Sequence, residues 1–218
     1  MKELDQLILD FGLKNNFEYN DYFVSKSNFY AFSTIDKWPS RDKKIVNIYG
    51  EKFSGKSHLA NILKSKSKDV FFVNKKFSNQ DLKTVKLHQT IIFDNFSNNV
   101  QEDLLYSLFN LIYQDNKHML ITSLKPLNEM EFKLKDMISR SKNCLFAKIE
   151  SPDDELIFAI LLKNFSDRQI YLDKKIVEFI IKRIDRSYSK IHEFIYKIDE
   201  LSLKKKRPIN IKTVKEII

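Results

Sequence analysis

Short apolar runs alternate with stretches of helical character over the first two thirds of the chain. Each run spans four to six residues, the length expected of a buried strand. The predicted strands are 45–49, 70–73, 90–94, 119–123 and 144–149, and the predicted helices between them are 56–66, 102–113 and 134–140. Strands that alternate with helices indicate βαβ units, so we expect an α/β fold with a mostly parallel sheet flanked by helices.

The pattern changes after Ser151-Pro152. Asp153 and the acidic residues that follow it place a capping side chain and negative charge at the start of a helix. The rest of the sequence has helical spacing, in segments at 153–165, 173–184, 188–203 and 211–217. We therefore expect an α/β core over 16–150 and a small, C-terminal, all-helical domain over 151–218.

A glycine-containing motif lies between the first predicted strand and the first predicted helix. It fits G-x-x-x-x-G-K-[ST] and holds two of the three glycines of the chain. Backbone N–H groups and the helix N-terminus would face the phosphates of a nucleotide, Lys56 would reach the β- and γ-phosphates, and Ser57 would bind Mg²⁺. A chance match is the alternative, but the strand and helix supply the context that the motif requires. The predicted nucleotide-binding residues are Gly50, Glu51, Lys52, Phe53, Ser54, Gly55, Lys56 and Ser57, with His58 next in the helix.

A carboxylate ends the third predicted strand. Asp94 follows three apolar residues, and we expect it to hold Mg²⁺ through water, together with Ser57. The alternative is an Asp in a turn at a strand end. Asn95 comes next, where a carboxylate would orient or activate the attacking water, and an amide cannot accept its proton. We therefore expect weak intrinsic hydrolysis.

Two hydroxyl residues end the fourth predicted strand. Thr122 and Ser123 lie close to the same edge of the predicted sheet, so they could contact the γ-phosphate or the attacking water. A cap at the end of a strand is the alternative for both residues. With the phosphate loop and Asp94, they complete the candidate catalytic residues that the strand ends supply.

Composition adds limits and one open question. The 218 residues include a single cysteine, Cys144, so an intramolecular disulfide is excluded and a cytoplasmic location is the simplest expectation. No apolar run is long enough to span a bilayer, so we expect no membrane association. The net charge of +9 suggests weak, non-specific contact with DNA, or only a lysine-rich composition, and both interpretations stay open.

The order of these motifs resembles that of AAA+ proteins of the DnaA group. The phosphate loop, the Asp-ended strand, the Thr-Ser-ended strand, a Ser-Arg pair and a helical lid follow one another, and within the group the chain is most similar to the Hda family over essentially its whole length. The resemblance implies an AAA+ core with a helical lid that binds ATP or ADP with Mg²⁺. The segment 23–31 resembles F-V-x-G-x-x-N-x-x-A, which implies that Phe23, Val24 and Asn28 lie beside adenine and ribose, although Lys26 replaces the family glycine.

Two further strings carry the resemblance. Residues 136–140 resemble the box that carries the arginine finger, which implies that Arg140 reaches the nucleotide of a neighbouring subunit; a surface salt bridge is the alternative. The lid string R-x-L is matched by 189–191, with Ser189 in place of the sensor arginine and Lys190 or Arg186 as candidates to replace it. Together with Asn95, this departure suggests a protein that holds nucleotide rather than a fast ATPase.

The N-terminal segment, residues 1–15, contains a second specific motif. Gln6-Leu7-Ile8-Leu9-Asp10-Phe11 resembles the Q-L-x-L-x-[LF] motif with which Hda proteins bind the DNA polymerase sliding clamp. An extended peptide can place Leu9 and Phe11 in an apolar pocket, with Gln6 as a hydrogen-bonding end and Leu7 between them. The alternative is an edge that packs on the core of the chain itself.

The resemblance implies a regulator of replication initiation. Such a protein binds the clamp and uses Arg140 to stimulate hydrolysis of ATP held by the initiator DnaA. The DNA-binding domain that follows the lid in DnaA is not found before Ile218, so we expect no sequence-specific origin recognition by this chain. The alternatives are a DNA-associated AAA+ ATPase or helicase-loader-like protein with its own ATP turnover, and a non-specific DNA-binding accessory protein. A homodimer is left open.

Overall fold

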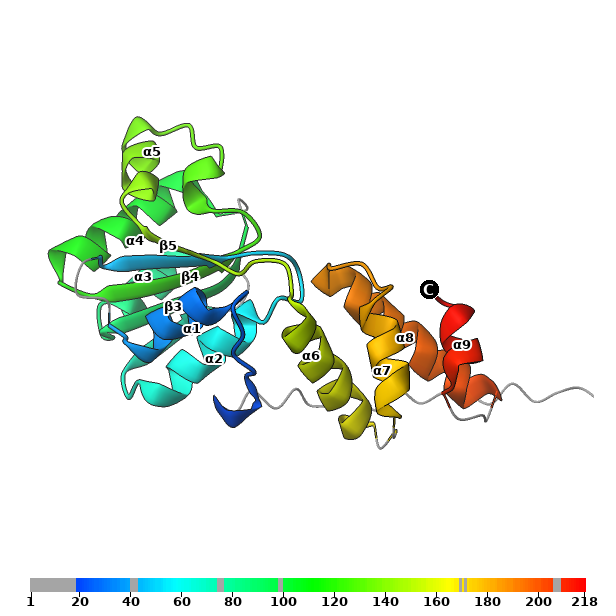
Figure 1. Ribbon diagram of the computed structural model, residues 1–218. Coiled ribbons are helices and arrows are strands. Elements are labelled where there is room, and N and C mark those ends of the chain that lie inside the picture. Colours follow the sequence, from blue (N-terminus) through cyan, green and yellow to red (C-terminus); the bar gives the residue numbers. More distant parts are fainter. Residues whose placement is uncertain are drawn as a thin grey trace, which may run out of the picture.

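A computed structural model describes residues 19–39, 43–73, 77–97, 100–168, 170, 172–205 and 209–218. Five parallel strands form one sheet in the order β2-β3-β4-β1-β5 (Figure 1). The strands are β1 Ile45–Tyr49, β2 Val70–Val73, β3 Thr90–Phe96, β4 His118–Ser123 and β5 Leu145–Lys148. The expected α/β fold is confirmed.

Helices cover both faces of this sheet. On one face lie α1 Phe29–Asp36 and α2 Lys56–Lys66, and on the other lie α3 Asn79–Val85, α4 Glu102–Gln114 and α5 Lys135–Lys142. Alternate residues of a strand point to opposite faces, so Ile91 and Phe93 of β3 pack with α4 while Ile92 between them packs with α2. The sheet is thus buried on both sides, which explains why its strands have continuous apolar sequences.

Strand register brings three strand ends to one edge of the sheet. β4 lies between β1 and β3, and Tyr49 at the end of β1 is paired with Ser123 at the end of β4. The register of β3 against β4 shifts between Phe93 and Phe96, the stretch that contains Asp94. The phosphate loop, Asp94 and the end of β4 therefore share one edge, the C-terminal edge at which parallel α/β sheets bind ligands.

A helical region follows the sheet in the chain. It contains α6 Asp154–Asp167, α7 Lys174–Ile181, α8 Tyr188–Lys205 and α9 Ile211–Lys215, which build an apolar cluster of their own around residues such as Phe165, Val177 and Ile198. Asp153 caps α6 as expected, because its Oδ1 accepts a hydrogen bond of 2.8 Å from Leu156 N. We call α6–α9 the lid. The boundary near residue 150 stays a prediction.

Most expected elements are present with small changes at their ends. The strands 45–49 and 70–73 and the helix 56–66 have the observed bounds, whereas β3 continues to Phe96 and α7 ends at Ile181 rather than residue 184. Two short helices, α1 and α3, were not expected, because the first 40 residues lack clear periodicity and α3 has only seven residues. Among the described residues, no helix has the length and apolar character needed to cross a membrane.

Candidate functional site

The phosphate loop connects β1 to α2 and depends on both of its glycines. Gly50 has a φ of 157° and Gly55 a φ of 91°, in the region that disfavours other residues. A Cβ on Gly50 would lie 2.9 Å from the carbonyl oxygen of Ile149, and one on Gly55 would lie 3.1 Å from the ring of Tyr22. The two glycines are therefore required by backbone conformation and by space.

Phe53 adopts an unusual conformation in the same loop. Its φ of 68° is rare for a bulky residue, and its side chain is 47% exposed. The ring stacks on His192 of α8, with centroids 3.9 Å apart and planes 6° from parallel, and Lys52 Nζ lies 4.9 Å from its centroid. The lid thus contacts the phosphate loop directly, at the residue with the least favourable backbone conformation.

Lys56 is buried beneath the loop. Its Nζ donates hydrogen bonds to the carbonyl oxygens of Gly50 (2.9 Å) and Glu51 (2.6 Å) and to Ser54 Oγ (3.3 Å). Burial lowers the pKa of Lys56 from 10.5 to about 8, and the negative charges of Asp94 and Glu51 only partly oppose this shift. The ammonium group is therefore short of counter-charge, which the phosphates of a nucleotide would supply.

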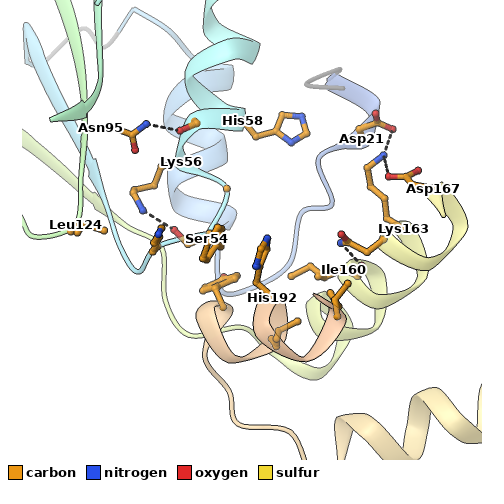
Figure 2. Close-up of a pocket in the computed structure, with 18 of the residues that line it drawn as sticks. Asp21, Ser54, Lys56, His58, Asn95, Leu124, Ile160, Lys163, Asp167 and His192 are labelled. Carbon is orange, nitrogen blue, oxygen red and sulfur yellow. Dashed lines mark hydrogen bonds and ion pairs between the residues drawn. The ribbon is translucent and has the colours of Figure 1, made fainter. Parts of the chain in front are cut away.

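The strand ends bring Asp94, Asn95, Thr122 and Ser57 together. Thr122 Oγ1 donates to Asp94 Oδ1 at 2.5 Å, and Asn95 Nδ2 donates to Asp94 Oδ2 at 3.1 Å and to Ser57 Oγ at 3.4 Å. Figure 2 shows Asn95 beside Lys56. Asn95 has a φ of 53°, and its backbone N donates to Thr122 Oγ1 at 2.8 Å. This corner has the oxygen groups that Mg²⁺ prefers.

A metal ion at this corner would need oxygen atoms from the nucleotide as well. In the described part of the chain, no three or more His, Cys, Asp or Glu side chains are grouped so that they could hold a metal. Mg²⁺ commonly binds one or two protein oxygen ligands together with phosphate oxygens and water. Ser57 and Asp94 fit that pattern.

Ser123 has a different environment from Thr122. Its Oγ donates to the carbonyl oxygen of Lys125 at 2.6 Å and accepts a hydrogen bond of 2.9 Å from Asn47 Nδ2. Asn47 also accepts a 2.9 Å bond from Leu127 N through its Oδ1. The hydroxyl of Ser123 therefore braces the end of β4. Sequence reasoning missed Asn47, although a polar residue inside an otherwise apolar strand was a usable signal.

A cavity of about 980 Å³ lies between the phosphate loop and the lid. We call it the cleft. Its core side includes Asn95, Leu124 and the loop, and its lid side includes residues of α6 and α8 (Figure 2). The lining residues are Asp21, Lys52, Phe53, Ser54, Gly55, Lys56, Ser57, His58, Asn95, Leu124, Ile160, Lys163, Asn164, Asp167, Arg168, Tyr188, Ile191, His192 and Ile195.

A smaller cavity of about 160 Å³ adjoins the cleft and shares several of its lining residues. Phe23 and Asn28 line it, whereas Val24 is not among its lining residues, and a place beside adenine stays a prediction for all three. Tyr22 also lines it and packs against Gly55 and, in a near-parallel stack at 5.8 Å, against Phe32. Sequence reasoning missed Tyr22, because an aromatic residue in a segment of weak periodicity gives no signal.

The start of α8 is attached to the phosphate loop. The carboxylate of Glu51 accepts hydrogen bonds of 3.0 Å from the backbone N of Tyr188 and of Ser189, and a further one from Ser187 Oγ. Tyr188 OH donates to the carbonyl oxygen of Glu150 at 3.0 Å. Glu51 therefore caps the N-terminus of α8 from another part of the chain. The position of Glu51 in the motif gave no sign of this cap, and its expected contact with nucleotide stays a prediction.

The two lid residues considered as substitutes for the sensor arginine lie away from the cleft. Lys190 Nζ pairs with Glu193 at 3.1 Å on the exposed side of α8, and Arg186 pairs with Asp154 at 2.8 Å. Neither residue lines the cleft. Ser189 contributes its backbone N to Glu51. The side chains of Lys190 and Arg186 are therefore not among the lid groups that face the phosphate loop.

Arg140 lies on α5, away from the cleft. Its guanidinium carbon is 5.0 Å from the ring centroid of Tyr106 and 5.6 Å from that of Tyr113, both on α4. Asp136, one turn earlier, accepts a 3.4 Å bond from Tyr106 OH. Among the described residues Arg140 has no ion pair, so the alternative of a surface salt bridge gives way to packing against two aromatic rings, and the finger role stays a prediction. The clamp-like residues Gln6, Leu7, Leu9 and Phe11 lie outside the described residues.

The parallel sheet, its flanking helices and the helical region that follows have the AAA+ fold. The structure matches domain III of the replication initiation protein DnaA from Thermotoga maritima with a TM-score of 0.75 at 17% identity, over 94% of this chain and 97% of that one. It matches AMPPCP-bound DnaA from Aquifex aeolicus with a TM-score of 0.67 at 17% identity, over 86% of this chain and 66% of that one.

Sequence comparisons find similarity to Hda and DnaA proteins. Residues 153–218 match the family model described as "Hda, lid domain". The chromosomal replication initiator protein DnaA of Borreliella afzelii is 22% identical over 85% of this chain and 44% of its own length, and that of Nautilia profundicola is 23% identical over 85% and 48%. The chain spans about half the length of the curated relatives it matches. The lid is thus similar to that of the Hda family, and the chain as a whole is similar to part of the replication initiator DnaA.

Proposed function

We propose that this protein binds ADP or ATP with Mg²⁺ in the cleft. The phosphates would lie over the loop amides and Lys56, the metal would lie at Ser57 and Asp94, and the base would enter the smaller cavity beside Phe23 and Asn28. The buried and under-compensated ammonium of Lys56 supports this proposal. The AMPPCP-bound relative from Aquifex aeolicus supports the nucleotide class.

We further propose that the protein is an Hda-type regulator that acts on ATP held by DnaA. The observation that carries this proposal is the placement of Arg140, which packs on Tyr106 and Tyr113 and lies away from the cleft of its own chain. An arginine held in this way has no task at its own nucleotide and can be presented to that of a neighbour. A trans-acting arginine stabilises transition-state charge and is worth ~10³–10⁵ in rate in GTPase systems. The match of the lid to the Hda model supports the regulatory role.

The protein itself is proposed to hydrolyse ATP slowly. Asn95 occupies the position from which a general base would act, and its amide group already donates to Asp94 and Ser57. An ATPase assay of the protein alone tests this point. Turnover of 1 s⁻¹ or more, the range typical of enzymes (about 1–10³ s⁻¹), would favour the alternative, a DNA-associated ATPase or helicase-loader-like protein.

Hydrolysis of DnaA-bound ATP, with sliding clamp and DNA present, tests the arginine finger. We expect Arg140→Ala to abolish the stimulation, and Arg140→Lys to recover little of it because lysine lacks the planar fork of donors. Arg183→Ala is the matched control, since Arg183 also packs on an aromatic ring, 3.8 Å from the centroid of Phe179, but lies on the lid. Stimulation that survives Arg140→Ala would refute the finger assignment.

Clamp binding is proposed to depend on Gln6, Leu7, Leu9 and Phe11. We expect the double variant Gln6→Ala, Leu9→Ala to lose binding in a pull-down with purified clamp, because both the hydrogen-bonding end and an apolar anchor are removed. Nucleotide binding by the same variant should equal that of the wild type. Undiminished capture of the clamp by the variant would remove the motif from the proposal. Non-specific DNA contact by the basic chain stays a separate prediction, with an affinity that falls as salt rises.

A further inference from the structure

The lid side of the cleft contains basic groups, but two of them are already paired. Lys163 Nζ lies 3.2 Å from Asp21 and 3.8 Å from Asp167. Figure 2 shows the end of the Lys163 side chain between these two carboxylates. Arg168 donates from Nε to Asp199 at 3.0 Å and from a terminal N–H to the carbonyl oxygen of Asn164 at 2.8 Å. Both side chains line the cleft, yet their charges are balanced within the lid or against the core.

His192 differs from both of these groups. It lies on α8 one turn after Ser189, the residue that the resemblance in the sequence matches to the lid arginine. Its ring projects from the lid helix into the cleft, on the side of Ser54 and Lys56 (Figure 2). Stacking on Phe53 holds the ring against the phosphate loop at 3.9 Å between centroids. No hydrogen bond joins the ring to another residue in the described part of the chain.

The charges around His192 are mostly positive. Burial lowers its pKa below 6.5, and Arg168, directly after α6, and Lys52 on the loop lower it further. Lys56 and His58 line the same cleft from α2. The nearby acids already have cationic partners: Asp21 and Asp167 share Lys163, Asp199 pairs with Arg168, and Glu193 pairs with Lys190 and Lys197 on the exposed side of α8. Without a ligand, the imidazole is therefore neutral near pH 7.

We propose that His192 is the lid's phosphate-binding group in place of the arginine, and that it takes up one proton when a nucleoside di- or triphosphate binds. This inference rests on the proposed nucleotide site. The polyphosphate brings negative charge into a cleft where Lys52, Arg168 and Lys56 otherwise oppose a further cation. The proton comes from solvent, and the imidazolium that forms gives the lid a positive contact, while the stack on Phe53 keeps the ring in place.

Affinity for ADP and for ATP, measured by titration calorimetry between pH 6.0 and 8.0, tests the proposal. Wild-type affinity should rise about three- to tenfold from pH 7.5 to 6.0, since one coupled proton changes affinity at most tenfold per pH unit. Heats measured in buffers of different ionisation enthalpy should show proton uptake on binding. Titration of the phosphates themselves is common to all variants, so each result is taken relative to His192→Asn.

Three variants make the test specific. His192→Asn should bind more weakly at pH 6.0 and lose the pH dependence beyond that of the phosphates. His192→Arg carries a permanent charge, so it should bind at pH 7.5 at least as tightly as the wild type does at pH 6.0, without added proton uptake. Glu193→Gln, the next residue on α8 but on the exposed side, should keep the wild-type profile.

The outcomes separate this inference from the proposed function. Lys56→Ala is expected to bind neither ADP nor ATP. If the wild-type protein also binds neither nucleotide, the proposed nucleotide site and the role of His192 are both overturned. Nucleotide binding with the same pH profile in the wild type and in His192→Asn would overturn the role of His192 alone. Equal weakening in His192→Asn and His192→Arg would indicate that the ring only packs on Phe53, and would likewise overturn the proposal.

Discussion

Lys56 shows how one residue can connect the stability of the fold to its ligand. Its ammonium group is buried among loop carbonyls, which satisfy its hydrogen bonds but neutralise little of its charge. Burying a charge without a close partner is unfavourable, and the lowered pKa of about 8 expresses that cost. The loop is therefore less stable without phosphate than its hydrogen bonds suggest, and a bound phosphate would relieve this.

The lowered pKa of Lys56 predicts a pH effect whose sign can be worked out. Between pH 8 and 9.5, the folded protein loses a proton from Lys56 that the unfolded chain keeps, so the free energy of unfolding should rise with pH. The gain from this group is about 1–2 kcal/mol over that window. Urea denaturation at both pH values measures it, and saturating nucleotide should diminish it, because phosphate keeps the lysine charged.

The matched control for this effect is Lys56→Met. Cys144, whose pKa burial raises to about 12, destabilises the fold as pH rises past its usual value of 9.0, and the buried Tyr22 and Tyr188 do so at higher pH. Those groups are unchanged in the variant, so the contribution of Lys56 is the wild-type pH dependence minus that of Lys56→Met. A difference of zero would contradict the buried, uncompensated ammonium.

At the scale of elements, hydrogen bonds to Glu51 connect the start of α8 to the phosphate loop that follows β1. We call this connection the joint. Sequence periodicity predicted the strands and most helices, because continuous apolar runs and 3.6-residue spacing are local signals. Motif spacing predicted that Lys56, Ser57 and Asp94 belong to one site. The cap that Glu51 places on α8 and the stack of Phe53 on His192 could not be predicted, since each joins residues more than 130 positions apart. Such pairings depend on how the lid sits on the core.

Glu51→Gln tests that joint. Burial alone would raise the pKa of Glu51, but hydrogen bonds from Ser187, Ser189 and Tyr188 outweigh it and lower the pKa. The stabilisation is therefore present above the usual pKa of 4.5 and lost as pH falls through the lower folded value. At pH 7 the free energy of unfolding of the variant should be about 0.5–2 kcal/mol lower, as for the loss of other N-caps. Amide hydrogen exchange at 187–191 should become faster.

The control for Glu51→Gln is an acid on the lid that makes no contact with the core. Glu178→Gln removes an exposed carboxylate whose partner is Lys174, 4.0 Å away on the same helix. Exposed pairs of this kind contribute little, so both stability and exchange at the start of α8 should stay at wild-type values. Equal exchange at 187–191 in the wild type and Glu51→Gln would show that the cap does not hold the lid.

At the scale of the whole molecule, the cleft is the place where core and lid share a ligand. The core contributes the phosphate loop and the strand ends, and the lid contributes α6 and α8, so a nucleotide in the cleft touches both. Direct contacts already link the two parts, through Glu51 with α8, Tyr188 with Glu150, and Ser27 with Asp153 at 3.0 Å. Nucleotide binding should therefore change the lid as well as the loop.

Hydrogen exchange with and without Mg²⁺-ADP measures this coupling. At a hundredfold excess over Kd, binding should raise the free energy of unfolding by about 2.7 kcal/mol, and slow exchange should appear in the phosphate loop, α6 and α8 together. Lys56→Ala should show none of these changes, because the loop loses its phosphate contact. In Glu51→Gln the loop should still gain protection while the start of α8 gains less, since one of its links to the loop is gone. If nucleotide slows exchange only in the phosphate loop of the wild type, then binding does not affect the lid. The position of Arg140 relative to α8 would in that case be independent of the bound ligand.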